Sequence, residues 1–222
     1  MIPTPDTSHL TAEDLDSVYE PAEDTYLLLD ALEADANELR EMKPTVAVEI
    51  GSGSGCVSAF LGKVLPGVPI LCVDINSRAC ECTRRTGIRN EVALEPIKMS
   101  FASSLLPRLK HSVDVLLFNP PYVPTEAEEA FYAQSGMTLP GSWAGGTDGM
   151  QVTDLFLPIV PKQLLSAQGR FYLVAVKQNN IADIQRRMEI LGLGCKIVLQ
   201  RRAGREHLFI LRFARLPQAS NE

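Results

Sequence analysis

Residues 45–55 read Thr-Val-Ala-Val-Glu-Ile-Gly-Ser-Gly-Ser-Gly, a short apolar run that passes directly into three alternating glycines. The apolar part, residues 45–50, predicts a buried strand, and residues 54–64, which follow the first two glycines, predict a helix. Glycines at such a turn let the chain bend sharply and let a ligand approach the backbone. An ordinary tight turn is the simpler explanation, but the combination also indicates a ligand site at the end of the first strand.

The spacing of these glycines argues against a dinucleotide site. The dinucleotide fingerprint is G-x-G-x-x-G, and from Gly51 its third glycine would fall at Cys56. The pattern present is instead E-x-G-x-G-x-G, which begins at Glu49. A carboxylate beside the loop accepts hydrogen bonds from a cationic amino group, whereas the dinucleotide loop is built for a pyrophosphate anion. These residues therefore favour a ligand that carries an amine and little negative charge.

Apolar runs alternate with helical patterns along the rest of the chain, which predicts an α/β fold with helices on both faces of a mostly parallel sheet. Seven strands are predicted, at residues 45–50, 69–74, 92–99, 113–118, 170–176, 195–200 and 207–213. Helices are predicted at residues 21–42, 54–64, 77–90, 152–165 and 180–191, with Ser77 as one cap. Residues 203–205 are few enough to join the last two strands as an antiparallel hairpin.

The composition fits one globular domain. The chain has 222 residues, of which 45% are hydrophobic, and its mean hydropathy is +0.03. We expect a single domain at residues 18–214, a flexible N-terminal tail at residues 1–17 and a polar tail at residues 215–222. No apolar run is long enough to span a membrane. Five cysteines, an odd number without framework spacing, indicate a reducing compartment, the cytoplasm or the nucleus.

Charge and cysteine spacing argue against two classes of ligand, although a local basic patch could still contact nucleic acid. The formal net charge is −6, from 21 basic and 27 acidic residues, which argues against tight binding to long nucleic acid. Cys80 and Cys82 are two positions apart on a predicted helix, so their side chains do not face each other. Without a second pair or a nearby histidine, we expect no metal site.

Polar residues follow two other predicted strands. Asp74 ends the second strand, where a carboxylate can accept hydrogen bonds from ribose hydroxyls or cap the next helix. The fourth predicted strand runs into Asn119-Pro-Pro-Tyr122. Because the carboxyl ends of parallel strands meet at one edge of a sheet, this motif and the glycine loop should share one crevice.

The motif Asn119-Pro120-Pro121-Tyr122 has the chemistry to hold a planar NH₂ group. Its two prolines stiffen the loop and leave backbone carbonyls free to accept a hydrogen bond. The Asn119 side chain offers an amide oxygen as a second acceptor, and Tyr122 offers an aromatic face for packing. A proline-rich turn or an exposed peptide ligand is the alternative explanation. The motif follows a run of buried apolar residues, however, which favours a catalytic role.

Together these motifs resemble those of the class I S-adenosylmethionine-dependent methyltransferases, which have a Rossmann-like fold. Asn119-Pro-Pro-Tyr122 is similar to the motif of enzymes that methylate planar nitrogens, namely N6-adenine DNA methyltransferases and HemK-type glutamine methyltransferases of release factors. Two further stretches, Val18-Tyr-Glu-Pro-Ala-Glu-Asp-Thr25 and Trp143-Ala-Gly-Gly146, resemble the eukaryotic HemK2 branch of this family. The similarity covers residues 18–213.

The resemblance implies a role for each motif residue. The cofactor would be S-adenosylmethionine (SAM), and no metal is implied. The residues implied to bind it are Glu20, Pro21, Thr25, Glu49, Gly51, Gly53, Gly55, Asp74, Ile75, Ser100, Phe101 and Asn119. The residues implied to orient the acceptor nitrogen are Asn119, Pro120, Pro121 and Tyr122. The family usually places an acidic residue at the position of Ser100, whose hydroxyl gives only an uncharged hydrogen bond. We therefore expect either looser recognition of adenine or help from a neighbouring residue.

The resemblance also implies a substrate and a partner. The implied reaction is N5-methylation of the glutamine in the Gly-Gly-Gln motif of the eukaryotic class 1 translation release factor. The alternatives are N6-adenine methylation of nucleic acid, histone lysine methylation and a non-catalytic subunit that only binds SAM. The implied partner is a small zinc-binding activator subunit. The predicted edge strand at 92–99 would expose unpaired backbone groups to it, although Pro96 can protect such an edge without a partner.

Overall fold

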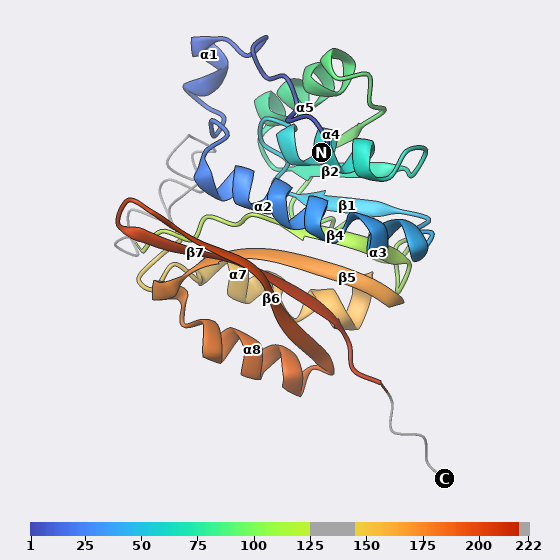
Figure 1. The fold of residues 1–222 in the computed structure, drawn as a ribbon, viewed down its shortest axis with the longest axis vertical. Coiled ribbons are helices and arrows are strands. Elements are labelled where there is room, and N and C mark those ends of the chain that lie inside the picture. Colours follow the sequence, from blue (N-terminus) through green and yellow to red (C-terminus); the bar gives the residue numbers. More distant parts are fainter. Residues whose placement is uncertain (125–144, 218–222) are drawn as a thin grey trace.

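The computed structural model describes residues 1–124 and 145–217, which build one seven-stranded sheet flanked by helices (Figure 1). The strand order is β3-β2-β1-β4-β5-β7-β6. Strands β1 to β5 pair in parallel, and β7 lies antiparallel between β5 and β6. The strands are β1 Ala47–Ile50, β2 Ile70–Asp74, β3 Glu95–Lys98, β4 Val113–Phe118, β5 Leu165–Val176, β6 Leu193–Ala203 and β7 Glu206–Arg215. The predicted α/β fold with an antiparallel C-terminal hairpin is confirmed.

Helices cover both faces of the sheet (Figure 1). One face carries α2 Glu23–Ala34, α3 Ala36–Glu41 and α4 Cys56–Val64, with α5 Ser77–Arg89 beside α4. The other face carries α7 Gln151–Phe156, the π-helix η2 Val160–Leu164 and α8 Ile181–Ile190. The short helices α1 Ala12–Leu15 and η3 Lys177–Asn179 lie outside these layers. Within the described ranges, no helix has both the length and the apolar character that crossing a membrane requires.

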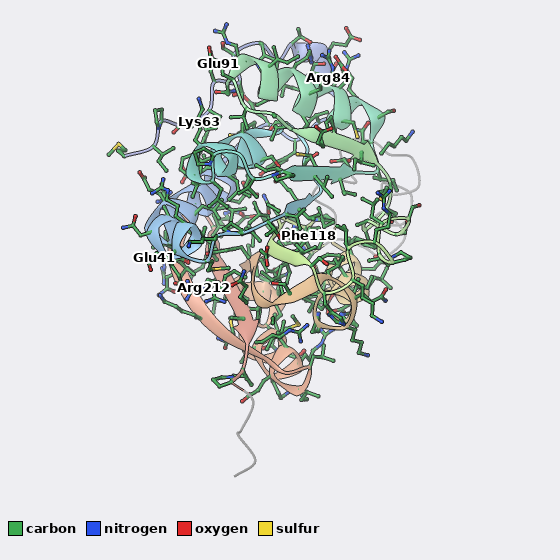
Figure 2. The ribbon with its side chains drawn as sticks, turned by 90° about the vertical axis from the view of Figure 1, so that its right-hand side faces the viewer. Glu41, Lys63, Arg84, Glu91, Phe118 and Arg212 are labelled. Atoms are coloured by element: carbon green, nitrogen blue, oxygen red, sulfur yellow. The ribbon has the colours of Figure 1, made fainter. Side chains whose placement is uncertain are left out.

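Strand β4 shows how alternating side chains build two separate cores. Val115 and Leu117 pack into the cluster formed with α2 and α4, whereas Leu116 and Phe118 pack into the cluster formed with α7 and α8. All four are buried because β4 is central, between β1 and β5. Figure 2 shows Phe118 in the interior and Arg84 at the outer surface. The residues that follow β4, beginning with Asn119, are therefore held in place by a fully buried strand.

The helix predicted at residues 21–42 is interrupted at Asp35, where α2 ends and α3 begins. Asp35 is 7% exposed, and its Oδ2 accepts hydrogen bonds from the Tyr172 hydroxyl (2.8 Å) and from Arg212 Nη1 (2.9 Å). Both donors lie more than 130 residues away in the sequence, so no local pattern marks the break.

The helix predicted at residues 152–165 is also shorter than expected. Pro158 and Pro161 cannot donate backbone hydrogen bonds, so regular α-helix ends after α7 and a π-helical turn leads into an early start of β5. The helix predicted from Ser77 begins there, but its cap is Asn76. The Asn76 Oδ1 accepts from the backbone N–H two residues on, at 2.9 Å.

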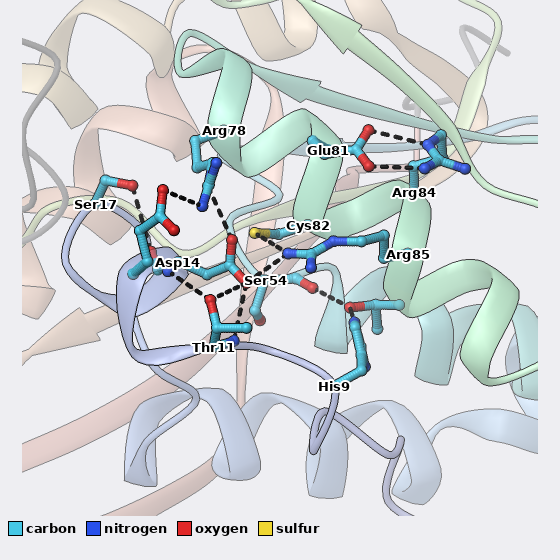
Figure 3. A network of polar contacts seen from close by, with 12 residues as sticks. His9, Thr11, Asp14, Ser17, Ser54, Arg78, Glu81, Cys82, Arg84 and Arg85 are labelled. Carbon is cyan, nitrogen blue, oxygen red and sulfur yellow. Dashed lines mark hydrogen bonds and ion pairs between the residues drawn. The ribbon is translucent and has the colours of Figure 1, made fainter.

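Residues 1–17, which we call the N-terminal strap, differ from the expected flexible tail because they pack across α5 (Figure 3). Asp14 is 1% exposed, and its carboxylate binds Arg78 Nε (2.8 Å) and Arg85 Nη2 (2.6 Å). The backbone N–H of Thr11 and the Arg85 guanidinium hold the pKa of Asp14 well below its usual range. Charged partners that lie far away in the sequence therefore order a segment that looks polar and loose when read locally.

Candidate active site

The carboxyl ends of β1, β2 and β4 open into one cavity of about 480 Å³. The sequence-predicted site residues that line it are Thr25, Glu49, Gly51, Gly53, Asp74, Ile75, Ser100, Phe101, Asn119, Pro120, Pro121 and Tyr122. Glu20, Pro21 and Gly55 lie outside this lining. The fold thus brings the glycine loop and the motif after β4 to a single site, although their sequence positions are far apart.

Backbone conformation keeps the glycine loop open. Gly51 and Gly53 have φ angles of +72° and +52°, a region that strains any residue with a side chain. The Gly53 N–H donates to Asp74 Oδ2 at 3.0 Å and ties the loop to the end of β2. Gly55 also has a positive φ, +78°, and it packs closely as well, since a Cβ there would lie 2.7 Å from the Cα of Thr83 on α5.

Glu49 lies on β1 and is 2% exposed. Burial raises the pKa of its carboxyl to about 8, although the hydrogen bond donated by Ser58 Oγ acts in the opposite direction. The nearby charge of Asp74 adds to the rise. Such a carboxyl holds a proton at neutral pH unless a cation is placed beside it. Glu49 therefore favours a ligand that brings a positively charged group.

Asp74 closes β2 and has two backbone donors. Its Oδ1 accepts from the Asn76 N–H (2.8 Å) and its Oδ2 from the Gly53 N–H (3.0 Å). Burial nevertheless raises its pKa above the ordinary value. The carboxylate orders the turn before α5 and also lines the cavity, so its structural role leaves it available to a ligand.

A residue on α2 orients the amide of Asn119. Asn119 Nδ2 donates to Asp24 Oδ2 at 2.9 Å, and the Tyr122 hydroxyl donates to the same oxygen at 3.0 Å. Burial, together with the charge of Asp24, raises the pKa of Tyr122 and keeps its hydroxyl protonated. Asn119 Oδ1 is buried and has no hydrogen-bond partner among the described residues. Because an unpaired buried oxygen is costly, we expect this atom to accept a hydrogen bond from a ligand.

Asn179, at the end of η3, binds the backbone at Tyr122, the last residue of the motif. Its Nδ2 donates to the backbone carbonyls of Tyr122 and Asp148, both at 3.0 Å, and its Oδ1 accepts from the Val176 N–H at 2.8 Å. Gly149 packs so closely that a Cβ there would lie 2.0 Å from the Tyr122 carbonyl oxygen. The position of the tyrosine is therefore set by residues on the far side of the loop.

Comparison with known proteins assigns this architecture to a family. A family model described as "Methyltransferase small domain" matches residues 18–138. The chain is 46% identical over 215 residues to "Methyltransferase HEMK2" of Mus musculus, with 96% of this chain and 97% of that protein covered. It is 43% identical over 229 residues to the "eRF1 methyltransferase catalytic subunit mtq2" of Schizosaccharomyces pombe, with 97% of each covered. The chain belongs to the HEMK2 and Mtq2 family of methyltransferases.

A solved structure agrees with this assignment. The Mtq2-Trm112 complex of E. cuniculi, described as responsible for methylation of the eRF1 translation termination factor, contains a chain that matches this methyltransferase with a TM-score of 0.65. The two are 28% identical, and the match covers 90% of this chain and 99% of the other. The relatives therefore share the whole fold, and not only the motifs around the cavity.

One wall of the cavity in this methyltransferase departs from the family pattern. Ser100, at a position where an acidic residue is usual, is exposed and lines the cavity. Phe101 and Ala102 follow with φ angles of +48° and +60°. The Phe101 ring stacks on Phe156 with centroids 5.4 Å apart and meets Phe118 edge-on at 6.4 Å. Aromatic packing, rather than a charge, therefore builds this wall.

Sequence reasoning missed several residues of the methyltransferase site. The motifs assign no role to Asp24, yet its carboxylate accepts hydrogen bonds from both Asn119 and Tyr122. Tyr19 and Glu206 also line the cavity. The one signal for Asp24 is its place in the N-terminal stretch that resembles the family. Glu206 comes from the last hairpin, and nothing in its local sequence marks it.

The remaining features of the sequence concern metal ligands, the cysteines of α5 and Trp143. Among residues 1–124 and 145–217, no group of three or more histidine, cysteine or acidic side chains is placed to hold a metal ion. Cys82 is buried on α5, where its sulfur accepts a hydrogen bond from Arg85 Nη2 at 3.4 Å. Trp143 lies outside the described residues.

Proposed function

We propose that this chain transfers a methyl group from SAM to the side-chain amide nitrogen of the glutamine in the Gly-Gly-Gln motif of a eukaryotic class 1 release factor. The observation that carries the proposal is the buried Asn119 Oδ1, which has no hydrogen-bond partner among the described residues, on a residue that lines one cavity with the glycine loop. The name of the S. pombe relative, an eRF1 methyltransferase catalytic subunit, supports the choice of substrate.

The residues of the cavity fit SAM. That cofactor supplies an electrophilic methyl group on a cationic sulfonium, attached to an amino acid part and a nucleoside. Glu49 would hold the ammonium of the amino acid part, because its buried carboxyl has no cationic partner within the described protein. The glycine loop would contact the same part, and Asp74 would accept hydrogen bonds from the ribose hydroxyls.

Asn119 and the prolines would act on the acceptor amide. An amide nitrogen is a poor nucleophile because its lone pair is delocalised into the carbonyl group. Asn119 Oδ1 would accept one N–H of the glutamine side chain, and a carbonyl of the Pro120–Pro121 pair would accept the other. Two fixed acceptors aim the nitrogen at the methyl group and stabilise the positive charge that develops on it. The proton leaves the nitrogen after transfer, so this step requires no strong base.

We also propose that a small zinc-binding activator subunit docks on β3. This strand lies at the sheet edge, where it pairs with β2. Glu95 and Lys98 are exposed on it, and Pro96 and Ile97 are half-buried. The E. cuniculi relative was solved as a complex with Trm112, which supports a partner of this kind. A chain that is monodisperse and fully active alone would contradict this part of the proposal.

A methyl-transfer assay tests the proposed reaction. The chain is co-expressed with the activator subunit and given labelled SAM with release factor, duplex DNA and histones as parallel acceptors. Peptide mass spectrometry should locate the methyl group on the Gly-Gly-Gln glutamine. Asn119→Ala should lose roughly 10²-fold in rate, the scale reported for removing one preorganised group, while it still binds SAM. Methyl on DNA or histone alone, or full activity of Asn119→Ala, would refute the proposal.

A further inference from the structure

Asp24 connects more of the site than its sequence context indicates. It lies in the first turn of α2 and is 3% exposed. Its Oδ2 accepts from Asn119 Nδ2 (2.9 Å) and from the Tyr122 hydroxyl (3.0 Å). Its Oδ1 accepts from the Thr25 N–H (2.7 Å) and from the Tyr19 hydroxyl (3.3 Å). One carboxylate thus joins α2, the chain just after the strap and the motif after β4.

The chemistry of a carboxylate decides how Asn119 must point. A carboxylate accepts hydrogen bonds and donates none, so only the NH₂ end of the Asn119 amide can face Asp24. The opposite end, Oδ1, is then left buried and without a hydrogen-bond partner among the described residues, on a residue that lines the cavity. If the amide turned over, two oxygens would meet at Asp24 and an NH₂ group would face the acceptor. An acceptor that is itself an N–H donor would then find no hydrogen-bond acceptor at that position.

We propose that Asp24 is the positioning residue that fixes the Asn119 amide with its oxygen toward the acceptor nitrogen. This inference rests on the proposed methyl transfer and adds a residue to it. We call this hydrogen bond between Asp24 and Asn119 the lock. It selects acceptors with an N–H group that can donate a hydrogen bond, because the enforced orientation of the Asn119 amide offers them only an oxygen. Asp24 acts through Asn119, and the Tyr122 hydroxyl on the same oxygen completes its set of donors.

Asp24 lies where two cavities share lining residues, on a possible path of the substrate side chain. A second cavity of about 500 Å³ lies beside the turn between β6 and β7. Asp24, Tyr19, Tyr122 and Glu206 line both this cavity and the one that holds the glycine loop. An acceptor side chain that enters through the second cavity would therefore pass Asp24 before it reaches Asn119.

The first test is the isosteric variant Asp24→Asn in the catalytic chain with its activator subunit. An asparagine at position 24 can satisfy either orientation of Asn119, so the lock is lost while the shape is kept. We expect kcat on release factor to fall roughly 10²-fold, with KM for SAM within about threefold of wild type. Asp30→Asn is the matched control, because it removes an exposed carboxylate from the same helix, where Asp30 pairs with Arg201. It should change neither constant.

A pair swap separates orientation from other roles of the charge. In Asp24→Asn/Asn119→Asp, the asparagine can donate to the aspartate, whose second oxygen then faces the acceptor. Net charge and the central hydrogen bond are both kept. We expect the double variant to regain roughly 10-fold over Asp24→Asn. A double variant no faster than Asp24→Asn would contradict the assigned role.

An NMR measurement tests the orientation of the Asn119 amide without any methyl acceptor present. With asparagine labelled by ¹⁵N, the side-chain NH₂ signals of Asn119 should be shifted by the carboxylate and exchange slowly with solvent in wild type. Both features should disappear in Asp24→Asn and persist in Asp30→Asn. Unchanged Asn119 signals in Asp24→Asn, or a kcat within about threefold of wild type, would overturn the inference. Wild-type protein that shows the shifted signals but methylates no release factor would instead overturn only the proposed function.

Discussion

The carboxyl of Glu49 offers a direct test of what the cavity binds. In the free protein, burial raises its pKa to about 8. An ammonium group beside it would favour the ionised form and lower that pKa. Binding of SAM should therefore expel a proton. The perturbation is a rise in pH from about 6 to about 7, an interval in which an α-amino group stays mostly protonated.

The magnitude follows from the pKa. With a value of about 8, roughly 1% of Glu49 is ionised at pH 6 and roughly 9% at pH 7. If only the ionised form binds, the dissociation constant should fall about ninefold over this interval, and about 0.9 proton should leave per molecule bound at pH 7. Whereas ligand affinity should rise with pH, the contribution of Glu49 to folding stability should fall. The pKa of Glu49 in the folded protein lies above its ordinary value of 4.5. The contribution of Glu49 to folding stability is therefore fully present below pH 4.5 and is lost as pH rises through about 8.

Calorimetric titration in two buffers of different ionisation enthalpy counts the protons released. S-adenosylhomocysteine is a suitable probe, because it keeps the amino acid part and lacks the reactive methyl. Glu49→Gln should bind more weakly and release none. Ser58→Ala removes a hydrogen bond that lowers the pKa of Glu49, so it should weaken binding at pH 7 and keep the release near one proton. A wild-type dissociation constant independent of pH, with almost no proton release, would refute the reasoning.

Two further predictions concern the supports of the site. Gly149→Ala places a Cβ 2.0 Å from the Tyr122 carbonyl oxygen, so it should destabilise the fold by about 1–3 kcal/mol in denaturant unfolding and lower kcat more than SAM affinity. Gly67→Ala, also at positive φ but with nothing within 4 Å of its Cβ, measures the backbone strain alone, and equal effects of the two variants would contradict this account. Asp14→Ala leaves two arginines of α5 without their buried partner and should cost about 1–3 kcal/mol in thermal unfolding and weaken SAM binding. Glu13→Ala, whose carboxylate is 82% exposed, should cost less than about 1 kcal/mol, and similar losses in both variants would count against an ordered strap.

Local patterns predicted most of the fold. An apolar run such as residues 115–118 favours a central strand, and a link as short as residues 203–205 favours a hairpin between its flanking strands. The same patterns could not reveal the contacts that finish the site. Asp24 and Asn119 are 95 positions apart, and Asp14 and Arg85 are 71 positions apart. Nothing in either neighbourhood tells which acid meets which donor, because the fold alone makes that choice.

One electrostatic property connects ligand choice with chemistry at this site. Among the described residues that line the glycine-loop cavity, Asp24, Glu49, Asp74 and Glu206 are acidic, and none is a lysine, arginine or histidine. Such a cavity disfavours a pyrophosphate, which agrees with the failure of the dinucleotide fingerprint at Cys56, and it favours a cationic sulfonium bearing an ammonium group. Under the proposed function, ionised carboxylates of this lining would also stabilise the positive charge that an amide nitrogen gains as it accepts a methyl group. The residues that we propose to select the cofactor would therefore also lower the barrier to the proposed transfer.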